Sequence, residues 1–381
     1  MTEWIAPMDK KAVTILSLIP YNVFPPHMGG QRAIVLFYRY LAQKISLHAI
    51  TQTLSLEKEA FTIYPILSKS PLRYINPLLF FRLKKRARDI AADFFLFEHP
   101  YFAWLLFFLK ITTQKKIIIR SHNIEALRFK DMKKPWWRIL FWYEAWAYRT
   151  ADIVWFITSK DRDFAIAQWQ LNKEKTFVIP YGTDRSVALQ ASEIVRWQTQ
   201  IKNKHGIATN EKILLFNGAL NYKPNEDAVV RIIKDIVPKL KAQNRMPFKI
   251  ILCGKGLAQH IIEDLPPEII YVGFVDNIDP YFAACDIFLN PTTQGGGIKT
   301  KLIEALAMGK LCVSTENGAI GLEAHNCDGQ LVVVSDNDWM AFAQAVINGL
   351  EHNAQTDFKT FYETFYWEKI VDKAIDSLTT A

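Results

Sequence analysis

The stretch of sequence that decides the fold covers residues 287–309 and reads IFLNPTTQGGGIKTKLIEALAMG. Its first residues, Ile287–Leu289, form an apolar run typical of a buried strand, and Ile298–Gly309 have the spacing of an amphipathic helix. Gly295–Gly297 lie between them. Because glycines let the backbone approach a ligand closely and helix N-termini attract negative charge, we expect an anion-binding loop between this strand and this helix.

The predicted helix carries one polar side beside its apolar one. At about 100° per residue, Leu302 and Ala305 face the sheet, while Lys301 and Glu304 fall on an adjacent side. This arrangement suits a nucleoside diphosphate, with lysine and backbone amides on phosphate and the carboxylate on ribose hydroxyls. The alternative is a glycine-rich turn followed by an ordinary surface pair at i,i+3 spacing. The loop lacks the Walker lysine and the GxGxxG spacing.

The same alternation of strand and helix extends over almost the whole chain. Many of the strand-like runs are continuously apolar, as expected for parallel strands buried on both faces. The sequence therefore predicts an α/β protein with two doubly wound, Rossmann-like sheets. Strands are expected at 13–19, 47–51, 61–67, 94–97, 116–119, 153–157 and 176–179, and again at 213–216, 248–252, 269–272, 287–289, 311–314 and 331–334.

Length and composition agree with two domains. The chain has 381 residues, half of them hydrophobic and 22% charged, which is enough for two packed cores of about 150–200 residues each. A turn at 180–184 and a polar helix around 191–204 mark the boundary. Ligands of open α/β sheets bind beyond the carboxyl ends of the strands, so the residues that follow strands are the candidate site residues.

Five motifs of the second half resemble, in order, those of family 4 (group 1) glycosyltransferases, which have the GT-B fold. They are FNGALNYKPNEDA at 216–228, CG at 253–254, VGFV at 272–275, YFAACD at 281–286 and the stretch from Gly295 to Lys310. The first half matches more loosely, through PPHMGG at 25–30 and RSHNIE at 120–125. Residues 363–378 resemble the closing helix of the family, which crosses back to the first domain.

The resemblance implies a role for each domain. Residues 1–185, with a C-terminal helix over 362–381, would bind the acceptor, and residues 205–360 would bind the nucleotide-sugar donor. It also implies that His122 touches the transferred sugar, although a lone histidine at a strand end is otherwise often only hydrogen-bonded locally. Catalytic residues are expected at His122, Lys301 and Glu304, and donor-binding residues at Gly29, Gly30, Gly218, Lys223, Phe274, Gly295, Gly296, Gly297 and Ile298.

One position departs from the family pattern. Many members carry two glutamates eight positions apart in this helix region, and Glu304 matches the second, which contacts ribose. The first falls on Gly296, so backbone N–H groups of Gly296–Ile298 would have to replace its contact with the donor sugar. This departure supports one alternative, a non-catalytic sugar-binding or scaffold protein of the same fold. A sugar-nucleotide epimerase is a further alternative, but the sequence offers no good second acid/base carboxylate.

The family retains anomeric configuration. The resemblance implies departure of the nucleoside diphosphate, with its charge stabilised by the glycine-rich loop, Lys301 and Lys223. No Asp-x-Asp pair follows a strand, so we expect neither a metal nor a cofactor besides the nucleotide sugar. The expected acceptor is a glycan or a lipid-linked glycan of cell-surface polysaccharide biosynthesis.

Charge and cysteines bear on partners and location. The chain carries 46 Lys and Arg against 38 Asp and Glu, a net charge of +8 that favours anionic partners. Basic and aromatic residues concentrate at 77–90 and 133–149, which predicts peripheral contact with an anionic membrane rather than with nucleic acid. The four cysteines form no CxxC pair, and residues 1–11 have no apolar core. We therefore expect a cytoplasmic protein, at the inner face of the plasma membrane.

Overall fold

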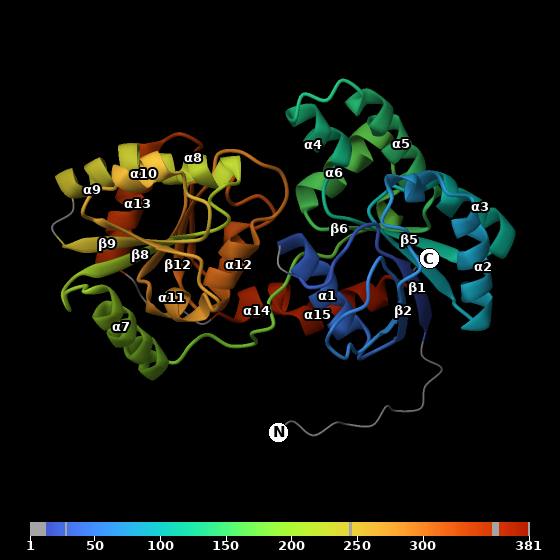
Figure 1. Ribbon diagram of the computed structural model, residues 1–381, viewed down its shortest axis with the longest axis horizontal. Helices are drawn as coiled ribbons and strands as arrows, with labels where there is room; N and C mark the ends of the chain where they lie inside the picture. The colour runs from blue at the N-terminus through green and yellow to red at the C-terminus, as the bar shows by residue number, and fades with distance from the viewer. Residues whose placement is uncertain (1–12, 27–28, 244–245, 353–357, 380–381) are drawn as a thin grey trace. The chain divides into compact units, whose positions relative to one another are not determined.

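The computed structural model describes residues 13–26, 29–243, 246–352 and 358–379 (Figure 1). The expectation about residues 1–11, and positions 27 and 28 of the PPHMGG motif, fall outside these ranges. The chain divides into two compact units. The first comprises residues 1–180 and 367–381, and the second comprises residues 181–366.

The first unit is built on a parallel sheet of seven strands in the order β3-β2-β1-β4-β5-β6-β7. All seven strands predicted for this half are present. Alternation of side chains explains why they read as continuous apolar runs. Phe97 and Ile119 pack under helices on one face, whereas Trp155 is buried on the other face against Phe37. The strands are β1 (Thr14–Leu18), β2 (Ser46–Ile50), β3 (Thr62–Tyr64), β4 (Phe94–Glu98), β5 (Lys116–Ser121), β6 (Ile153–Phe156) and β7 (Thr176–Val178).

Helices cover both faces of this sheet (Figure 1). Leucines and alanines of α2, α3 and α5 pack on one face, and α1 packs with α15 on the other. The first helix begins at Gly29, so Gly29 and Gly30 form its first turn. The helices are α1 (Gly29–Leu41), α2 (Leu78–Asp89), α3 (Ala103–Thr113), α4 (Glu125–Asp131), α5 (Trp137–Thr150) and α6 (Ser159–Trp169), with 3-10 turns η1 (Pro71–Ile75) and η2 (Lys173–Lys175).

The closing helix expected over 363–378 is two helices, α14 (Lys359–Phe365) and α15 (Trp367–Asp376). Extended backbone at Tyr366 separates them, and this residue pairs with Thr183 in an isolated bridge. Helix α14 belongs to the second unit and α15 to the first. Trp367 is fully buried against Phe37, and Trp155 donates a hydrogen bond to Ser377 just beyond α15. The break lets one segment of chain complete two separate cores.

The second unit contains a parallel sheet of six strands in the order β10-β9-β8-β11-β12-β13, again all present as predicted. Figure 1 shows α8 and α9 on one side of it and α7 and α11 on the other. Residues 181–204, which the sequence placed at the boundary, belong to this unit. The strands are β8 (Lys212–Asn217), β9 (Phe248–Cys253), β10 (Ile269–Gly273), β11 (Ile287–Asn290), β12 (Leu311–Thr315) and β13 (Leu331–Val334). The helices are α7 (Ala191–His205), α8 (Lys223–Arg231), α9 (Val237–Gln243), α10 (Gln259–Glu263), α11 (Asp279–Ala284), α12 (Thr300–Ala307) and α13 (Trp339–Glu351), with the π turn η3 (Ile232–Ile236) and the 3-10 turn η4 (Ala324–Cys327).

Each sheet has one point at which the strand order reverses. In the first unit β1 pairs with β2 on one side and β4 on the other, and in the second β8 pairs with β9 and β11. Loops that follow the two central strands diverge at such a point and leave a crevice in which ligands bind. The candidate site residues should therefore follow β1 and β4 in one unit and β8 and β11 in the other.

Candidate functional site

In the second unit, a lysine of the loop itself organises the glycine-rich segment after β11. The Lys299 ammonium group donates to the carbonyls of Gly295 (2.7 Å) and Gly297 (3.0 Å). Gly295 and Gly297 have positive φ, 91° and 73°, which explains the glycines. Because these bonds hold residues 295–299 in a loop, α12 begins at Thr300 and not at Ile298 as expected. The glycine-rich loop is therefore followed by extended backbone at Lys299, after which α12 begins.

Lys301 lies where β8, α8 and α12 meet. Its Nζ is 3.1 Å from Asn225 Oδ1 and 4.0 Å from the centroid of the Phe216 ring. Burial, followed by repulsion from Lys299, lowers the pKa of Lys301 to about 7, and burial lowers the pKa of Lys299 to about 8. Burial makes both lysines lose their protons more readily, and an anion bound beside them would stabilise the protonated, positively charged forms. Lysines of this kind beside a glycine-rich loop are suited to an anion such as a phosphate group.

Close backbone contacts at the ends of β8 and β9 explain two further glycines. A Cβ on Gly254 would lie 1.7 Å from the Gly218 carbonyl oxygen, and a Cβ on Gly218 would lie 2.7 Å from Asn225 Nδ2. Asn225 in turn binds Ala219 O and Lys301. The structure thus brings Gly218 and Lys301 together through Asn225, a residue that the sequence argument did not single out.

A buried polar cluster supports the base of the glycine-rich loop. Asn290, at the end of β11, donates to Ser314 Oγ (3.0 Å) and to Gly318 O (2.9 Å), and Thr315 donates to Thr292 O (2.6 Å). Every one of these side chains is buried. A fully hydrogen-bonded buried network fixes its members in one arrangement. The sequence motif Asn-Pro-Thr after a strand was visible, but its partners on β12 were not.

The other residues of the second unit that the sequence predicted for the site lie at different places around the glycine-rich loop and on α8 and α12. Lys223 is the first residue of α8 and forms ion pairs with Glu226 (2.9 Å) and Asp227 (2.8 Å) on the same helix, which raise its pKa. Glu304 follows Lys301 by one turn of α12, and Gly296 and Ile298 lie on the loop.

Phe274 follows β10 and is 68% exposed. It lines a pocket of about 650 Å³ together with Lys204, His205 and Tyr281. Among the described residues that line this pocket, none belongs to the glycine-rich loop.

In the first unit, His122 follows β5 and is buried against two charged neighbours. Its Nε2 atom is hydrogen-bonded to Glu98 Oε2 at the end of β4, and Glu98 Oε1 lies 3.5 Å from Arg120 Nη1. Burial, followed by the charge of His99, lowers the pKa of His122 to about 4. Although burial opposes ionisation of Glu98, Arg120 and His122 lower its pKa to about 2. Near pH 7 a neutral imidazole therefore donates its Nε2 proton to a carboxylate, which leaves Nδ1 as an acceptor.

A second histidine, which sequence reasoning missed, lies on His122. The rings of His99 and His122 are stacked with centroids 4.4 Å apart, and His99 has a φ of +69°. Tyr21 hydroxyl is 3.1 Å from His99 Nε2, and Glu125 Oε1 is 3.6 Å from His99 Nδ1. A positive φ in a non-glycine residue at the end of a strand was not predictable from spacing, and such conformations gather at functional sites.

Both histidines line one pocket of about 630 Å³ after β1, β4 and β5. Gly30 and His122, both predicted, lie in it, together with a set of aromatic side chains and one charged pair, Glu125 with Arg128 (2.5 Å). Gly29 adjoins Gly30 in the first turn of α1. The remaining lining residues are Tyr21, Tyr74, His99, Tyr101, Asn123, Phe129, Trp136, Leu140 and Tyr143. Aromatic faces beside a few charged groups suit a sugar or another amphiphilic ligand.

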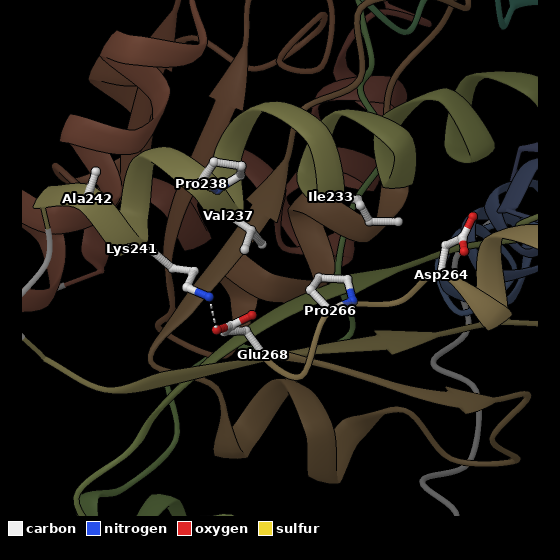
Figure 2. Close-up of a pocket in the computed structure, with 8 residues that line it drawn as sticks. All are labelled: Ile233, Val237, Pro238, Lys241, Ala242, Asp264, Pro266 and Glu268. Atoms are coloured by element: carbon white, nitrogen blue, oxygen red, sulfur yellow. Dashed lines mark ion pairs between the residues drawn. The ribbon is translucent and has the colours of Figure 1, made fainter.

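A further pocket, shown in Figure 2, has the features of a structural groove. Its volume is about 560 Å³, and its apolar side chains surround a salt bridge of 2.6 Å between Lys241 and Glu268. Ile233 of the π turn η3 and Val237 and Pro238 at the start of α9 line it. It lies away from the carboxyl ends of β8 and β11, so we do not assign the site to it.

Comparison with known proteins agrees with this geometry. The family model described as "Glycosyltransferase Family 4" matches residues 28–187, and the model described as "Glycosyl transferases group 1" matches residues 211–352. These two ranges cover most of the chain. The chain belongs to the family 4, group 1 glycosyltransferases. The resemblance noted in the sequence is thereby confirmed. The first range covers β2–β7 of the first sheet and the second covers all six strands of the second sheet.

This glycosyltransferase has low sequence identity to the curated proteins that it matches. It is 24% identical to a chitobiosyldiphosphodolichol beta-mannosyltransferase of Debaryomyces hansenii, over 77% of this chain and 66% of the relative. It is 27% identical to an N-acetyl-alpha-D-glucosaminyl L-malate synthase of Bacillus anthracis, over 47% and 48%. The alignments thus span between about half and just under two thirds of these curated relatives.

Solved structures show that the fold is GT-B. The Anabaena protein Alr3699/HepE, crystallised in complex with UDP, has a TM-score of 0.74 at 16% identity, with 97% of this chain and all of that chain covered. WaaG, a glycosyltransferase involved in lipopolysaccharide biosynthesis, has a TM-score of 0.63 at 13% identity, with 96% and 100% covered. The predicted pair of Rossmann-like sheets is confirmed.

Proposed function

We propose that this protein is a retaining glycosyltransferase that moves a sugar from a nucleotide-sugar donor to a glycan or lipid-linked acceptor. The observation that carries the proposal is the cluster of Lys301, Lys299 and the glycine-rich loop after β11. Burial lowers the pKa values of both lysines at the point where strand order reverses. A nucleoside diphosphate supplies the negative charge that such a site favours. UDP is the first candidate, because the related fold of HepE was crystallised with it.

In this proposal the second unit binds the donor and stabilises its departure. Charge develops on the diphosphate as the glycosidic bond breaks, and fixed N–H groups with two lysines stabilise it without a metal or a cofactor. Glu304 binds the ribose hydroxyls, and backbone N–H groups of Gly296–Ile298 contact the sugar in place of the missing glutamate. Phe274 and Lys223 contribute at the margins of the site, where Lys223 must first leave Glu226 and Asp227.

The first unit supplies the acceptor site. The aromatic pocket after β1, β4 and β5 is large enough to admit sugar rings, and neutral His122 offers a hydrogen-bond acceptor at its wall. Glu98 acts as a positioning residue, because its bond to Nε2 fixes the orientation of the imidazole. We place the reaction in cell-surface polysaccharide biosynthesis, at the cytoplasmic face of the plasma membrane.

The first test is binding of UDP, GDP, dTDP, CDP and ADP, measured by thermal shift and calorimetry. A ligand that binds the native state raises its stability, so one nucleotide should raise Tm, and Glu304→Ala should abolish that rise. Lys234→Ala, an exposed lysine of η3, is the control and should keep it. If no nucleotide binds to the folded protein, the scaffold alternative that Gly296 suggests replaces this proposal.

The second test addresses the reaction. With the donor class known, NMR of the product reports whether the anomeric configuration of the donor is kept. Activity that persists in excess EDTA agrees with a metal-independent mechanism. An inverted product contradicts the retaining mechanism, and loss of activity in EDTA that Mg²⁺ restores contradicts the metal-independent one.

A further inference from the structure

Large apolar side chains are exposed mainly in one part of the first unit. Of the 20 large hydrophobic residues that are exposed among the described residues, 12 lie between positions 72 and 146. Single exposed apolar residues are normal, but a contiguous group marks an interaction surface. The 12 are Leu72, Ile75, Leu78, Phe81, Phe107, Phe108, Ile111, Met132, Trp136, Ile139, Trp142 and Trp146. We call the surface that they form on η1, α2, α3 and the α4–α5 segment the aromatic face.

The aromatic face is continuous across three helices. Helix α3 packs against both α2 and α5 (Figure 1). Phe80 of α2 meets Phe108 of α3 with ring centroids 6.4 Å apart, and Phe107 of α3 meets Trp146 of α5 at 5.7 Å. Leu79, Leu83 and Ala87, the apolar residues of the basic segment 77–90 that line one side of α2, are buried in the core. The exposed apolar residues are a second set on the outer side.

Positive charge borders the face on two sides. Positions 77–90 hold five basic residues and one acidic residue, Asp89, and positions 128–138 likewise hold five and one, Asp131. Helix α3 between them has Lys110 as its one charged residue. Lys85, Arg88, Lys133 and Lys134 are exposed. Among the described residues, no helix is long and apolar enough to cross a membrane.

We propose that the aromatic face binds the surface of an anionic lipid bilayer. Tryptophan and phenylalanine side chains insert at the level of the headgroups, and flanking lysines and arginines attract acidic lipids. A second copy of the chain is a poor occupant, because two strongly basic borders would be brought together. The charge pattern therefore selects an acidic surface, and the exposed apolar side chains of the three packed helices suit the headgroup region of a bilayer.

The position of the face relative to the acceptor pocket gives the proposal a consequence. Trp136 belongs to the face and lines the pocket, and Tyr143 of the pocket lies 5.9 Å from the Trp146 ring. The mouth of the pocket is thus close to the bilayer, from which an amphiphilic acceptor can enter. This consequence rests on the proposed transferase function, whereas lipid binding itself does not.

The experiment is co-sedimentation of the full chain with vesicles of phosphatidylcholine, alone or with phosphatidylglycerol. We expect binding to the acidic vesicles, weakened by salt, and a blue shift of tryptophan fluorescence. Phe81→Ser/Trp142→Ser should abolish the shift and the binding. Lys85→Glu/Lys134→Glu should lower the partition coefficient roughly tenfold or more, because each basic residue near a membrane contributes to attraction. The matched controls, Leu56→Ser/Val187→Ser and Lys234→Glu/Lys359→Glu, change exposed residues elsewhere and should bind like the parent.

Three outcomes would overturn the proposal. They are no binding to acidic vesicles at low salt, binding that both sets of variants reduce equally, and a dimer in light scattering that Phe81→Ser/Trp142→Ser dissociates. The last result would assign the face to self-association. Nucleotide binding measured on the same variants separates this proposal from the transferase proposal, because it should be unchanged in all of them.

Discussion

Glu98 is a buried carboxylate held between Arg120 and His122 at the carboxyl edge of the first sheet. All three side chains are within the interior, and Arg120 also lies over the Phe37 ring, 4.0 Å from its centroid. A buried cation whose partner is removed is costly, because no water replaces the lost interaction. Glu98 therefore stabilises the fold by neutralising Arg120 and also orients His122. The first effect is measured as stability and the second as activity.

The Glu98→Gln variant tests both. It leaves Arg120 buried without its anion, so we expect the free energy of unfolding to fall by about 3–5 kcal/mol in chemical denaturation. Below the denaturation midpoint, kcat should fall at least roughly tenfold, because His122 loses its orientation. Glu57→Gln removes a carboxylate from an exposed pair with Arg39 and should change stability by less than about 1 kcal/mol. Equal effects of the two variants would contradict the role given to Glu98.

Lys301 gives a prediction about pH. Its pKa is lowered to about 7, so above pH 7 the Lys301 amine of the free protein is mostly neutral. A bound diphosphate stabilises the protonated form, and binding above pH 7 therefore requires the uptake of a proton. The Kd of the nucleotide, measured by calorimetry, should therefore rise by roughly tenfold or more between pH 7 and pH 9. The phosphate groups themselves titrate mainly below this range. Lys301→Met should bind more weakly and with a flatter profile, whereas Lys234→Met keeps the slope. Parallel profiles for Lys301→Met and the parent would refute this assignment.

At the scale of elements, the ends of β8 and β9 approach so closely that two glycines are required. Gly254 has a φ of +142°, and its missing side chain would overlap the Gly218 carbonyl. Gly30, in contrast, lies in the first turn of α1 with no atom within 4 Å of the position of a Cβ. The same substitution therefore has opposite structural consequences at these two positions.

We expect Gly254→Ala to lower the free energy of unfolding by at least about 2 kcal/mol, since the backbone must shift and the φ is unfavourable. Nucleotide affinity should fall with it, because Gly218 and Asn225 support Lys301. Gly30→Ala should leave stability unchanged or raise it by up to about 1 kcal/mol. A fall in transfer activity of Gly30→Ala at full stability would then report on the pocket itself. Stability of Gly254→Ala equal to that of the parent would contradict the close contact.

At the scale of the whole molecule, the chain forms two units whose cores are separate but whose last two helices are consecutive. Helix α15 completes the first core through Trp367, although the sequence between 181 and 366 belongs to the second. Each unit should therefore respond to its own ligands and substitutions. Hydrogen exchange followed by mass spectrometry resolves the two, because each peptide belongs to one unit.

Trp367→Ala should destabilise the first unit by about 3–5 kcal/mol and speed exchange in its sheet, while exchange in β8–β13 stays the same. The matched variant is Trp339→Ala, in α13 of the second core, which should have the reverse effect. A nucleotide should slow exchange chiefly in the second unit. Uniform changes across both units for either variant would show that the cores do not behave separately.

The sequence by itself determined the fold class and the placement of every strand, because parallel strands buried on both faces must be continuously apolar. It also determined the family, and it placed Lys301, the glycine-rich loop and His122 after strands. Local rules set these features, so spacing along the chain reveals them.

Only the tertiary structure decided which residues surround them. Glu98 and His99 reach His122 from another strand, and Asn225 reaches Lys301 from another helix. It also decided that Leu79, Leu83 and Ala87 of α2 belong to the core and that α14 and α15 are separate helices. Such contacts join residues far apart in the chain, and the apolar pattern of a helix does not distinguish a side that packs on a sheet from one that remains exposed.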